Sequence, residues 1–90
     1  MDEWIDRFAE ALGEQPLHPT EVGSMLKLSR EVAHGVERKL APLSTFLAGL
    51  SVGRKTAEGS SRDQALGQVL EAARALLPPP SDETPAAASA

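Results

Sequence analysis

The feature that most constrains the fold is residues 22–36, where apolar side chains recur with the period of an α-helix. Members at i, i+3, i+4, i+7, i+10, i+11 and i+14 form one stripe along such a helix. The stripe comprises Val22, Met25, Leu26, Ser29, Val32, Ala33 and Val36. Aromatic residues make up only 3% of the chain while Leu and Ala are abundant, which favours a helical core over a sheet.

Two helices are predicted on either side of a proline-containing loop near the start of the chain. The first runs from about Asp2, a plausible N-cap, to Leu12, and Gly13 ends it. Its apolar stripe comprises Trp4, Ile5, Phe8 and Leu12. The segment EQPLHP has two prolines and is predicted to be a loop, after which Thr20 caps the helix that carries the stripe of residues 22–36.

The third predicted helix runs from about Ala41 to Val52. Pro42 fits its first turn, where the missing N–H costs nothing, and Gly53 ends it. Its apolar positions at i, i+3, i+4 and i+7 are Leu43, Phe46, Leu47 and Leu50. Residues 55–60 are predicted to form a polar loop.

A fourth helix is predicted after Ser61, which with Gln64 has the spacing of a capping box. Three consecutive prolines from Pro78 stop it, and the Pro/Ala-rich stretch that follows lacks large apolar residues. The sequence therefore predicts an all-α, compact four-helix domain over residues 1–77 and a disordered C-terminal tail over residues 78–90.

Composition narrows the class of protein. Ninety residues suffice for one domain, and the absence of cysteine excludes disulfides and thiolate zinc sites. The acidic start, MDEWIDRF, does not resemble a signal peptide, and no apolar run approaches the roughly 18 residues that span a membrane. We expect a soluble, cytoplasmic protein that does not engage a membrane.

Charge is distributed unevenly along the chain. Residues 1–21 hold six acids and one base, a net charge of −5, whereas residues 22–55 hold six bases and two acids, a net charge of +4. On the second predicted helix, Arg30, His34 and Arg38 recur every four residues and form a ridge that Lys27 and Lys39 extend. These bases either pair with the acidic first helix or bind phosphate or the carboxylates of a partner.

Glycines inside the predicted helices need an explanation, because each costs about 1 kcal/mol relative to alanine. Gly35 and Gly49 are interpreted as positions of close packing, where a neighbouring helix approaches the backbone, and close approach of a ligand is the alternative.

No arrangement of residues indicates catalysis. The sequence lacks G-x-S-x-G, the phosphate-binding glycine motifs, and any nucleophile with a base at a recognised spacing. No carboxylate at helical ligand spacing would build a convincing metal site around either His18 or His34. We therefore expect a protein that is not an enzyme and that holds no metal or cofactor.

The run REVAHGVERKLAPLSTFLAGLSVGR resembles a small helical domain of unknown function from actinobacteria. That domain occurs alone or fused to the C-terminus of molybdenum cofactor guanylyltransferases, which join a guanine nucleotide to molybdopterin. The matching features are Trp4, V-A-H-G-V at 32–36, Arg38, and A-P-L-S-T-F-L-A-G at 41–49. Lys39 departs from the pattern, since relatives often carry proline there, and the guanylyltransferase fold itself is absent from this chain.

The resemblance implies a non-catalytic accessory domain associated with biosynthesis of the molybdenum cofactor, molybdopterin guanine dinucleotide. Its partner would be the guanylyltransferase or a molybdoenzyme. Two alternatives remain. A helix-turn-helix nucleic-acid binder is disfavoured by a pI near 5.0 and a third helix poor in basic and amide side chains. A structural dimerisation module would be favoured by an exposed Leu28 or Trp4, although packing is the preferred interpretation of Leu28.

Overall fold

The computed structural model describes residues 3–78 and contains four α-helices. They are α1 (Glu3–Ala11), α2 (Pro19–Gly35), α3 (Leu40–Ala57) and α4 (Arg62–Leu76). No strand occurs in residues 3–78, so the predicted all-α class and the number of helices are confirmed. The predicted Asp2 cap and nearly all of the predicted tail lie outside the described residues.

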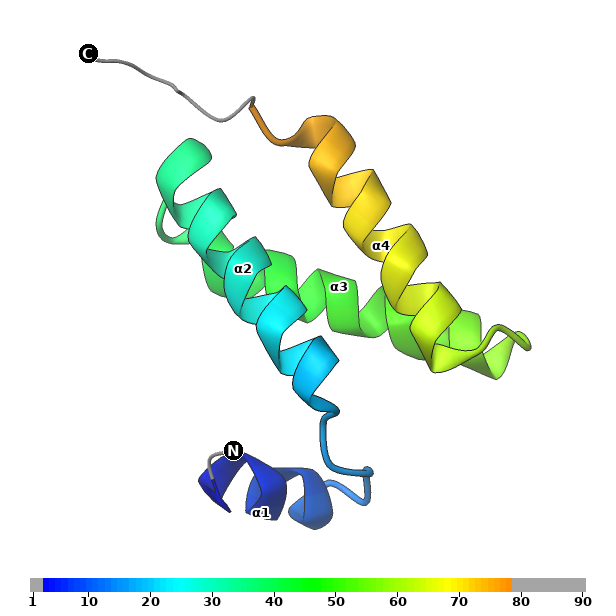
Figure 1. The fold of residues 1–90 in the computed structure, drawn as a ribbon. Helices are drawn as coiled ribbons and strands as arrows, with labels where there is room; N and C mark the ends of the chain where they lie inside the picture. Colours follow the sequence, from blue (N-terminus) through cyan, green and yellow to red (C-terminus); the bar gives the residue numbers. More distant parts are fainter. Residues whose placement is uncertain (1–2, 79–90) are drawn as a thin grey trace.

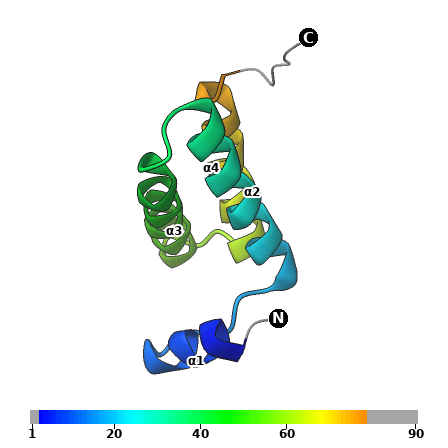
Figure 2. The same cartoon turned by 90° about the vertical axis from the view of Figure 1, so that its left-hand side faces the viewer.

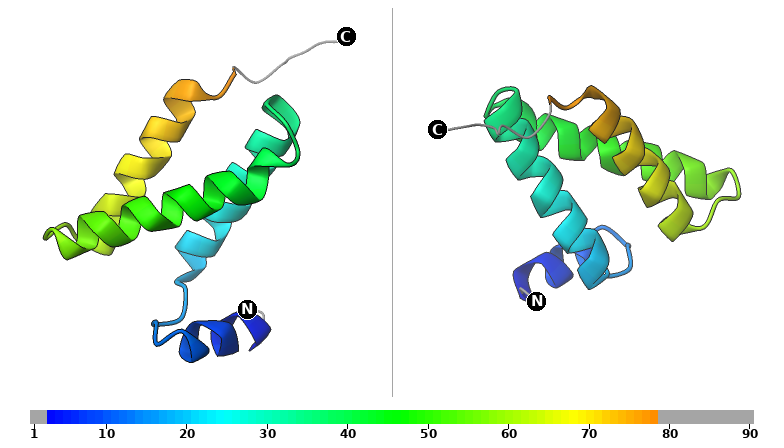
Figure 3. Two further views of the ribbon diagram at one scale, coloured as in Figure 1. Left: turned by 180° about the vertical axis from the view of Figure 1, so that it is seen from behind. Right: turned by 45° about the horizontal axis from the view of Figure 1, so that its top comes forward.

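Three of the helices pack together and the fourth stands apart. Helices α2 and α4 lie side by side against the same side of α3, which crosses both of them (Figures 1 and 3). α3 packs closely on α2 and on α4, whereas α2 and α4 touch each other much less. Within the described range, α1 packs against none of these three helices and lies beyond the start of α2 (Figure 2).

The start of α2 differs from the prediction, because His18 and not Thr20 is the N-cap. The His18 Nδ1 atom accepts a hydrogen bond from the Thr20 backbone N–H at 3.2 Å, and the Glu21 carboxylate accepts one from the His18 N–H at 2.8 Å. This is a capping box built on an imidazole, with Pro19 in the first turn. Thr20 was the conventional choice, since histidine is not among the preferred N-cap residues.

The turn between α2 and α3 begins earlier than the charge pattern suggested. α2 ends at Gly35, and the backbone N–H groups of Val36 and Glu37 both donate to the Val32 carbonyl at 2.9 Å. Arg38 therefore lies in the turn and does not continue the helical ridge of Arg30 and His34. Pro42 lies in the first turn of α3, as predicted.

α3 is longer than predicted and passes through Gly53 to Ala57. Its last turns carry the partly buried side chains of Val52, Lys55 and Thr56. The burial gained along this extra length outweighs the helix cost of one glycine, about 1 kcal/mol. The predicted loop over residues 55–60 therefore shortens to residues 58–61, where Gly59 adopts a φ of 111°.

The start of α4 follows the prediction. The Ser61 Oγ accepts a hydrogen bond from the Gln64 N–H at 3.0 Å, and the Gln64 side chain accepts one from the Ser61 N–H at 3.3 Å. This reciprocal pair is the predicted capping box. It starts α4 with Ala65 and Leu66 both buried.

The core is small and lies where the three helices meet. Leu28, Val32 and Ala48 form its centre, and partly buried residues from α2, α3 and α4 surround them. Leu28 retains only 4% of its accessible surface, which confirms the packing interpretation of this residue. Four of the seven buried apolar residues in the described range are alanines, so little large apolar surface is removed from water.

The large apolar side chains of α3 face outward. Leu43, Phe46 and Leu50 keep 56%, 65% and 55% of their surface exposed, while Ala41 and Ala48 are buried. Successive helical positions differ by about 100°, so Phe46 and Ala48 lie on nearly opposite faces of α3. The predicted apolar stripe is present on α3, but it faces solvent, and α3 packs on α2 and α4 through its small residues.

Candidate functional site

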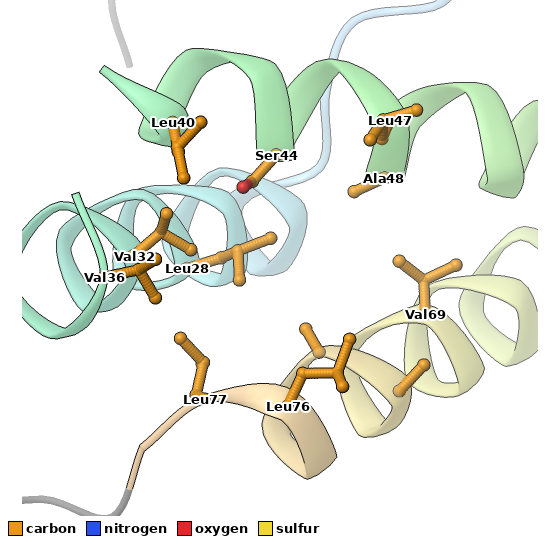
Figure 4. Close-up of a pocket in the computed structure, with 12 residues that line it drawn as sticks. Leu28, Val32, Val36, Leu40, Ser44, Leu47, Ala48, Val69, Leu76 and Leu77 are labelled. Atoms are coloured by element: carbon orange, nitrogen blue, oxygen red, sulfur yellow. The ribbon is translucent and has the colours of Figure 1, made fainter. Parts of the chain in front are cut away.

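An apolar groove with a volume of about 340 Å³ lies between the three packed helices. Its walls come from α2 and α4 and its floor from α3, and side chains from all three converge on the same space (Figure 4). The groove is lined by Leu28, Val32, Val36, Leu40, Ser44, Leu47, Ala48, Val69, Ala72, Ala73, Leu76 and Leu77.

The groove exists because of how the helices end and where small residues lie. The small side chains of Ser44 and Ala48 on α3 do not fill the space between α2 and α4. Because α2 and α4 contact each other little, this space stays open to solvent. Val36 lies just past the end of α2 and Leu76 ends α4, and these two residues are 56% and 88% exposed. Large apolar side chains therefore stand in water at the rim of the groove.

The lining restricts what the groove can bind. Every lining residue other than Ser44 has an apolar side chain, so the site offers a single hydroxyl and no ionisable group. Proton transfer and metal coordination both need such groups. Among residues 3–78, no cluster of three or more His, Cys, Asp or Glu side chains could hold a metal ion. The groove suits apolar side chains.

The predicted basic residues lie outside the groove. Lys27, Arg30 and His34 are exposed on α2, and none of them belongs to any of the three ion pairs found within residues 3–78. Arg38 is exposed in the turn after α2, and Lys39 pairs with Glu37 at 3.4 Å. The structure thus brings Arg38 and Lys39 together in the turn and separates them from the bases on α2.

The carboxylates of α1 form no ion pair with these bases in the part of the chain that the structure describes. Within residues 3–78, the one ion pair that joins distant segments links Arg62 at the start of α4 to Glu21 in the capping box of α2. The Arg62 Nη2 and Nε atoms donate to the two oxygens of Glu21, which is a bidentate arrangement. This pair fixes the start of α2 to the start of α4.

The two glycines singled out in the sequence have different surroundings. A Cβ atom at Gly35 would lie 3.0 Å from Cγ of Pro78, so the chain leaving α4 approaches the end of α2 at this point. A Cβ atom at Gly49 would meet nothing within 4 Å, so the structure shows no neighbouring helix close to that backbone.

Sequence reasoning did not anticipate the groove. The sequence assigns Val36 to the stripe of residues 22–36 and Leu47 to the stripe of the third predicted helix, each as part of a separate helix. The groove depends on where the three helices cross, and helix periodicity contains no information on crossing. The one available signal was the large apolar pair Leu76 and Leu77 placed directly before three prolines.

Comparison with known proteins yields one match. The model of a family described as a domain of unknown function (DUF6457) matches residues 1–85, which is nearly the whole chain. No curated protein and no solved structure matches. Within residues 3–78, no helix is both long and apolar enough to cross a bilayer.

Proposed function

The chain belongs to the DUF6457 family of domains of unknown function, and we propose that it is a non-catalytic interaction domain. Its groove receives an amphipathic helical segment of a protein partner. The observation that supports this most directly is the groove itself, an apolar space of about 340 Å³ open to solvent between α2, α3 and α4.

The size and lining of the groove match helix recognition. Binding pockets range from roughly 300 to 1,000 Å³, and helix-in-groove partners insert apolar anchors spaced i, i+3, i+4 and i+7. Leu76 and Val36 at the rim are largely exposed, and covering them gains about 25 cal/mol for each Å² removed from water. An apolar anchor between these two residues therefore replaces hydrated surface with contacts.

The partner that we propose is a molybdenum cofactor guanylyltransferase or a molybdoenzyme, in the cytoplasm. This identity rests on the resemblance of residues 30–54 to a domain that is fused to such transferases. The residues that carry the resemblance also build the groove. V-A-H-G-V contributes Val32 and Val36, and A-P-L-S-T-F-L-A-G contributes Ser44, Leu47 and Ala48.

The unpaired bases suggest the charge of the partner. Arg30 and His34 on α2 and Arg38 in the following turn are exposed and form no ion pair in the described chain. Arg30 and His34 are each two residues from the lining residue Val32 and therefore lie on the far side of α2 from the groove. Arg38 follows the rim residue Val36 by two positions, so a carboxylate that flanks the apolar anchors of the partner would meet Arg38, which can bind it with two hydrogen bonds. Binding should weaken as salt rises, because exposed charges are screened beyond about 10 Å at 0.1 M salt.

A nucleic-acid partner fits the structure less well. In a helix-turn-helix protein, the second helix presents side chains that reach base edges. The exposed face of α3 presents Leu43, Phe46 and Leu50 instead, which cannot donate or accept hydrogen bonds. The structure therefore favours a protein partner over a nucleic acid.

The test is an amide NMR titration of the ¹⁵N-labelled chain with the guanylyltransferase of the same organism. We expect shifts or broadening along the groove and over residues 27–39. Leu76→Lys, at the groove rim, should reduce binding at least tenfold. Its matched control is Leu26→Lys, since Leu26 is also exposed (61%) but lies on the face of α2 opposite Leu28.

Both substitutions keep a good helix former at an exposed position, so we expect both variants to fold. An unchanged spectrum with the transferase and with a molybdoenzyme would refute the proposed partners. Equal loss of binding in both leucine variants would refute the groove as the binding site.

A further inference from the structure

Two apolar faces remain uncovered in the described chain, and neither belongs to the groove walls. The first is formed by α1 and the residue that follows it, where Trp4, Phe8 and Leu12 are 63%, 45% and 60% exposed. The second is the outer face of α3, formed by Leu43, Phe46 and Leu50, each at least 55% exposed. Soluble proteins seldom leave contiguous apolar patches of this kind uncovered.

The two faces have matching dimensions. The stripe from Trp4 to Leu12 spans eight helical rises, or about 12 Å at 1.5 Å per residue, and the stripe from Leu43 to Leu50 spans about 10 Å. The rings of Trp4 and Phe8 stack with centroids 5.2 Å apart, so they form one flat apolar surface. If the two helices packed lengthwise against each other, each stripe would cover the other.

The two helices also have opposite charge. α1 holds three acids, Glu3, Asp6 and Glu10, against Arg7, a net charge of −2. α3 contains no acid and carries Arg54 and Lys55, a net charge of +2; Arg54 pairs with Glu58 at 3.3 Å, and Lys55 lies on the side of Ala48. Net charges of opposite sign favour the approach of α1 to α3 and disfavour that of α1 to a second α1, while the acids Asp6 and Glu10 stay on the side of α1 opposite Trp4.

The connection between α1 and α2 determines whether α1 contacts α3 of its own chain or α3 of a second copy. After α1 the Glu14 N–H donates to the Ala9 carbonyl at 2.9 Å, and before α2 the His18 N–H donates to Glu21, which is held by Arg62 of α4. Only Gln15, Pro16 and Leu17 separate these two fixed ends, a reach of about 14 Å at most.

In the view from behind, α3 lies in front of α2 and α4 (Figure 3). Its outer face lies opposite the buried Ala41 and Ala48 and so points away from these two helices. To lie along the outer face of its own α3, α1 would have to turn within residues 15–17 or break the hydrogen bonds of Glu14 and His18 on either side of them. A short, proline-containing linker of this kind favours exchange of the terminal helix between two copies.

We infer that two copies of this chain form a dimer in which the α1 of each copy covers the outer face of α3 of the other. The contact is made twice about a twofold axis, so the dimer buries both sets of exposed side chains. Its four phenylalanines each offer roughly 150–250 Å², about half of it still exposed in the single chain. Together with the tryptophans and leucines this approaches the about 1,600 Å² of a standard interface.

The first measurement is sedimentation of the 90-residue chain over a concentration series. The chain has a mass of 9.5 kDa, and we expect a species of twice that mass. Phe8→Asp and Phe46→Asp should each give the monomer with unchanged helical circular dichroism, because both side chains are exposed in the single chain. Leu76→Lys at the groove should leave the dimer intact, so failure of the groove proposal and failure of the dimer are distinguishable.

The second measurement tests whether α1 of one copy binds α3 of another, while the mass of the wild-type chain separates this exchange from closure within one chain. A labelled Phe8→Asp chain keeps an intact α3 face, and an unlabelled Phe46→Asp chain keeps an intact α1. Adding the second to the first should shift the amide resonances of residues 43–50. Adding unlabelled Phe8→Asp chain, which lacks a functional α1, should not shift them.

A wild-type chain that stays at 9.5 kDa up to millimolar concentration would overturn the inference. So would an absence of shifts in the mixture of complementary variants. A dimer that survives Phe46→Asp would show that the outer face of α3 is not the contact.

Discussion

The outward orientation of the α3 stripe makes a quantitative prediction about two substitutions that sequence periodicity would treat alike. Leu28→Ala removes a side chain that is 4% exposed at the centre of the core, and Phe46→Ala removes one that is 65% exposed. A buried Leu→Ala change costs about 3–5 kcal/mol through lost transfer energy and the remaining cavity. Stability of about 0.05–0.15 kcal/mol per residue gives the 76 described residues only about 4–11 kcal/mol in total. Leu28→Ala should therefore remove at least about a quarter of the stability, and nearly all of it at the lower end of this range.

For Phe46→Ala the same reasoning gives a much smaller cost. A fully buried phenylalanine would cost about 3–5 kcal/mol, and only about a third of this side chain is buried, which leaves about 1 kcal/mol. Alanine returns about 0.5 kcal/mol through its better helix propensity, so the net cost is below about 1 kcal/mol in the single chain.

Urea unfolding followed by circular dichroism measures both costs, at a concentration where sedimentation shows a monomer. Equal losses for the two variants would refute the packing of α3 by its alanine face. At high concentration the cost of Phe46→Ala should rise while that of Leu28→Ala should not, because only the first removes surface buried in the dimer.

Two further predictions test local features. Gly49→Ala should raise the free energy of unfolding by about 0.5–1 kcal/mol, because the new Cβ enters open space, and the Tm should rise by about 4–8 °C per kcal/mol. Gly35→Ala should gain less, since its Cβ would lie 3.0 Å from Pro78. Equal gains in the two variants would contradict that contact. Glu21→Ala should cost about 1–2 kcal/mol, because it removes the capping-box acceptor and the partner of Arg62 together. Arg62→Ala should cost less, since its side chain is 41% exposed, and a double-mutant cycle by urea unfolding that shows no coupling would contradict the ion pair.

Helix boundaries were predictable where a local hydrogen bond determines them. The capping box of Ser61 and Gln64 needs only residues three apart, and both of its bonds form. His18 was missed because an imidazole serves as N-cap far less often than the hydroxyl of Thr20, although Glu21 stands at the right distance for the box. Gly53 was taken as a helix end because its local cost was visible in the sequence and the burial that offsets it was not.

The face that α3 turns toward the core was not predictable from periodicity. Periodicity identifies side chains that share a face, but it does not say which face meets the other helices when both are apolar. On α3, the leucines and phenylalanine occupy one face, and Ala41 and Ala48 lie on the other. Small residues let helix axes approach closely, so the face with Ala41 and Ala48 packs on α2 and α4. The face with the leucines and the phenylalanine then remains exposed to solvent. The same reasoning explains why the groove, whose floor is Ser44 and Ala48, could not be located from the sequence.

The groove and the outer face of α3 share one residue, which decides how the two proposals can be separated. Leu47 lines the groove and also continues the stripe of Leu43 and Leu50, and it is 64% exposed. It lies about 100° from Ala48 and about 100° from Phe46, so it sits at the border between the two surfaces. A change at Leu47 should weaken both partner binding and dimerisation and cannot discriminate between them. Leu76 belongs to the groove alone and Phe46 to the outer face alone, so the dimer leaves both grooves open. A partner with two binding segments could then engage both grooves at once, and its apparent affinity would fall when Phe46→Asp separates the copies even though each groove is intact.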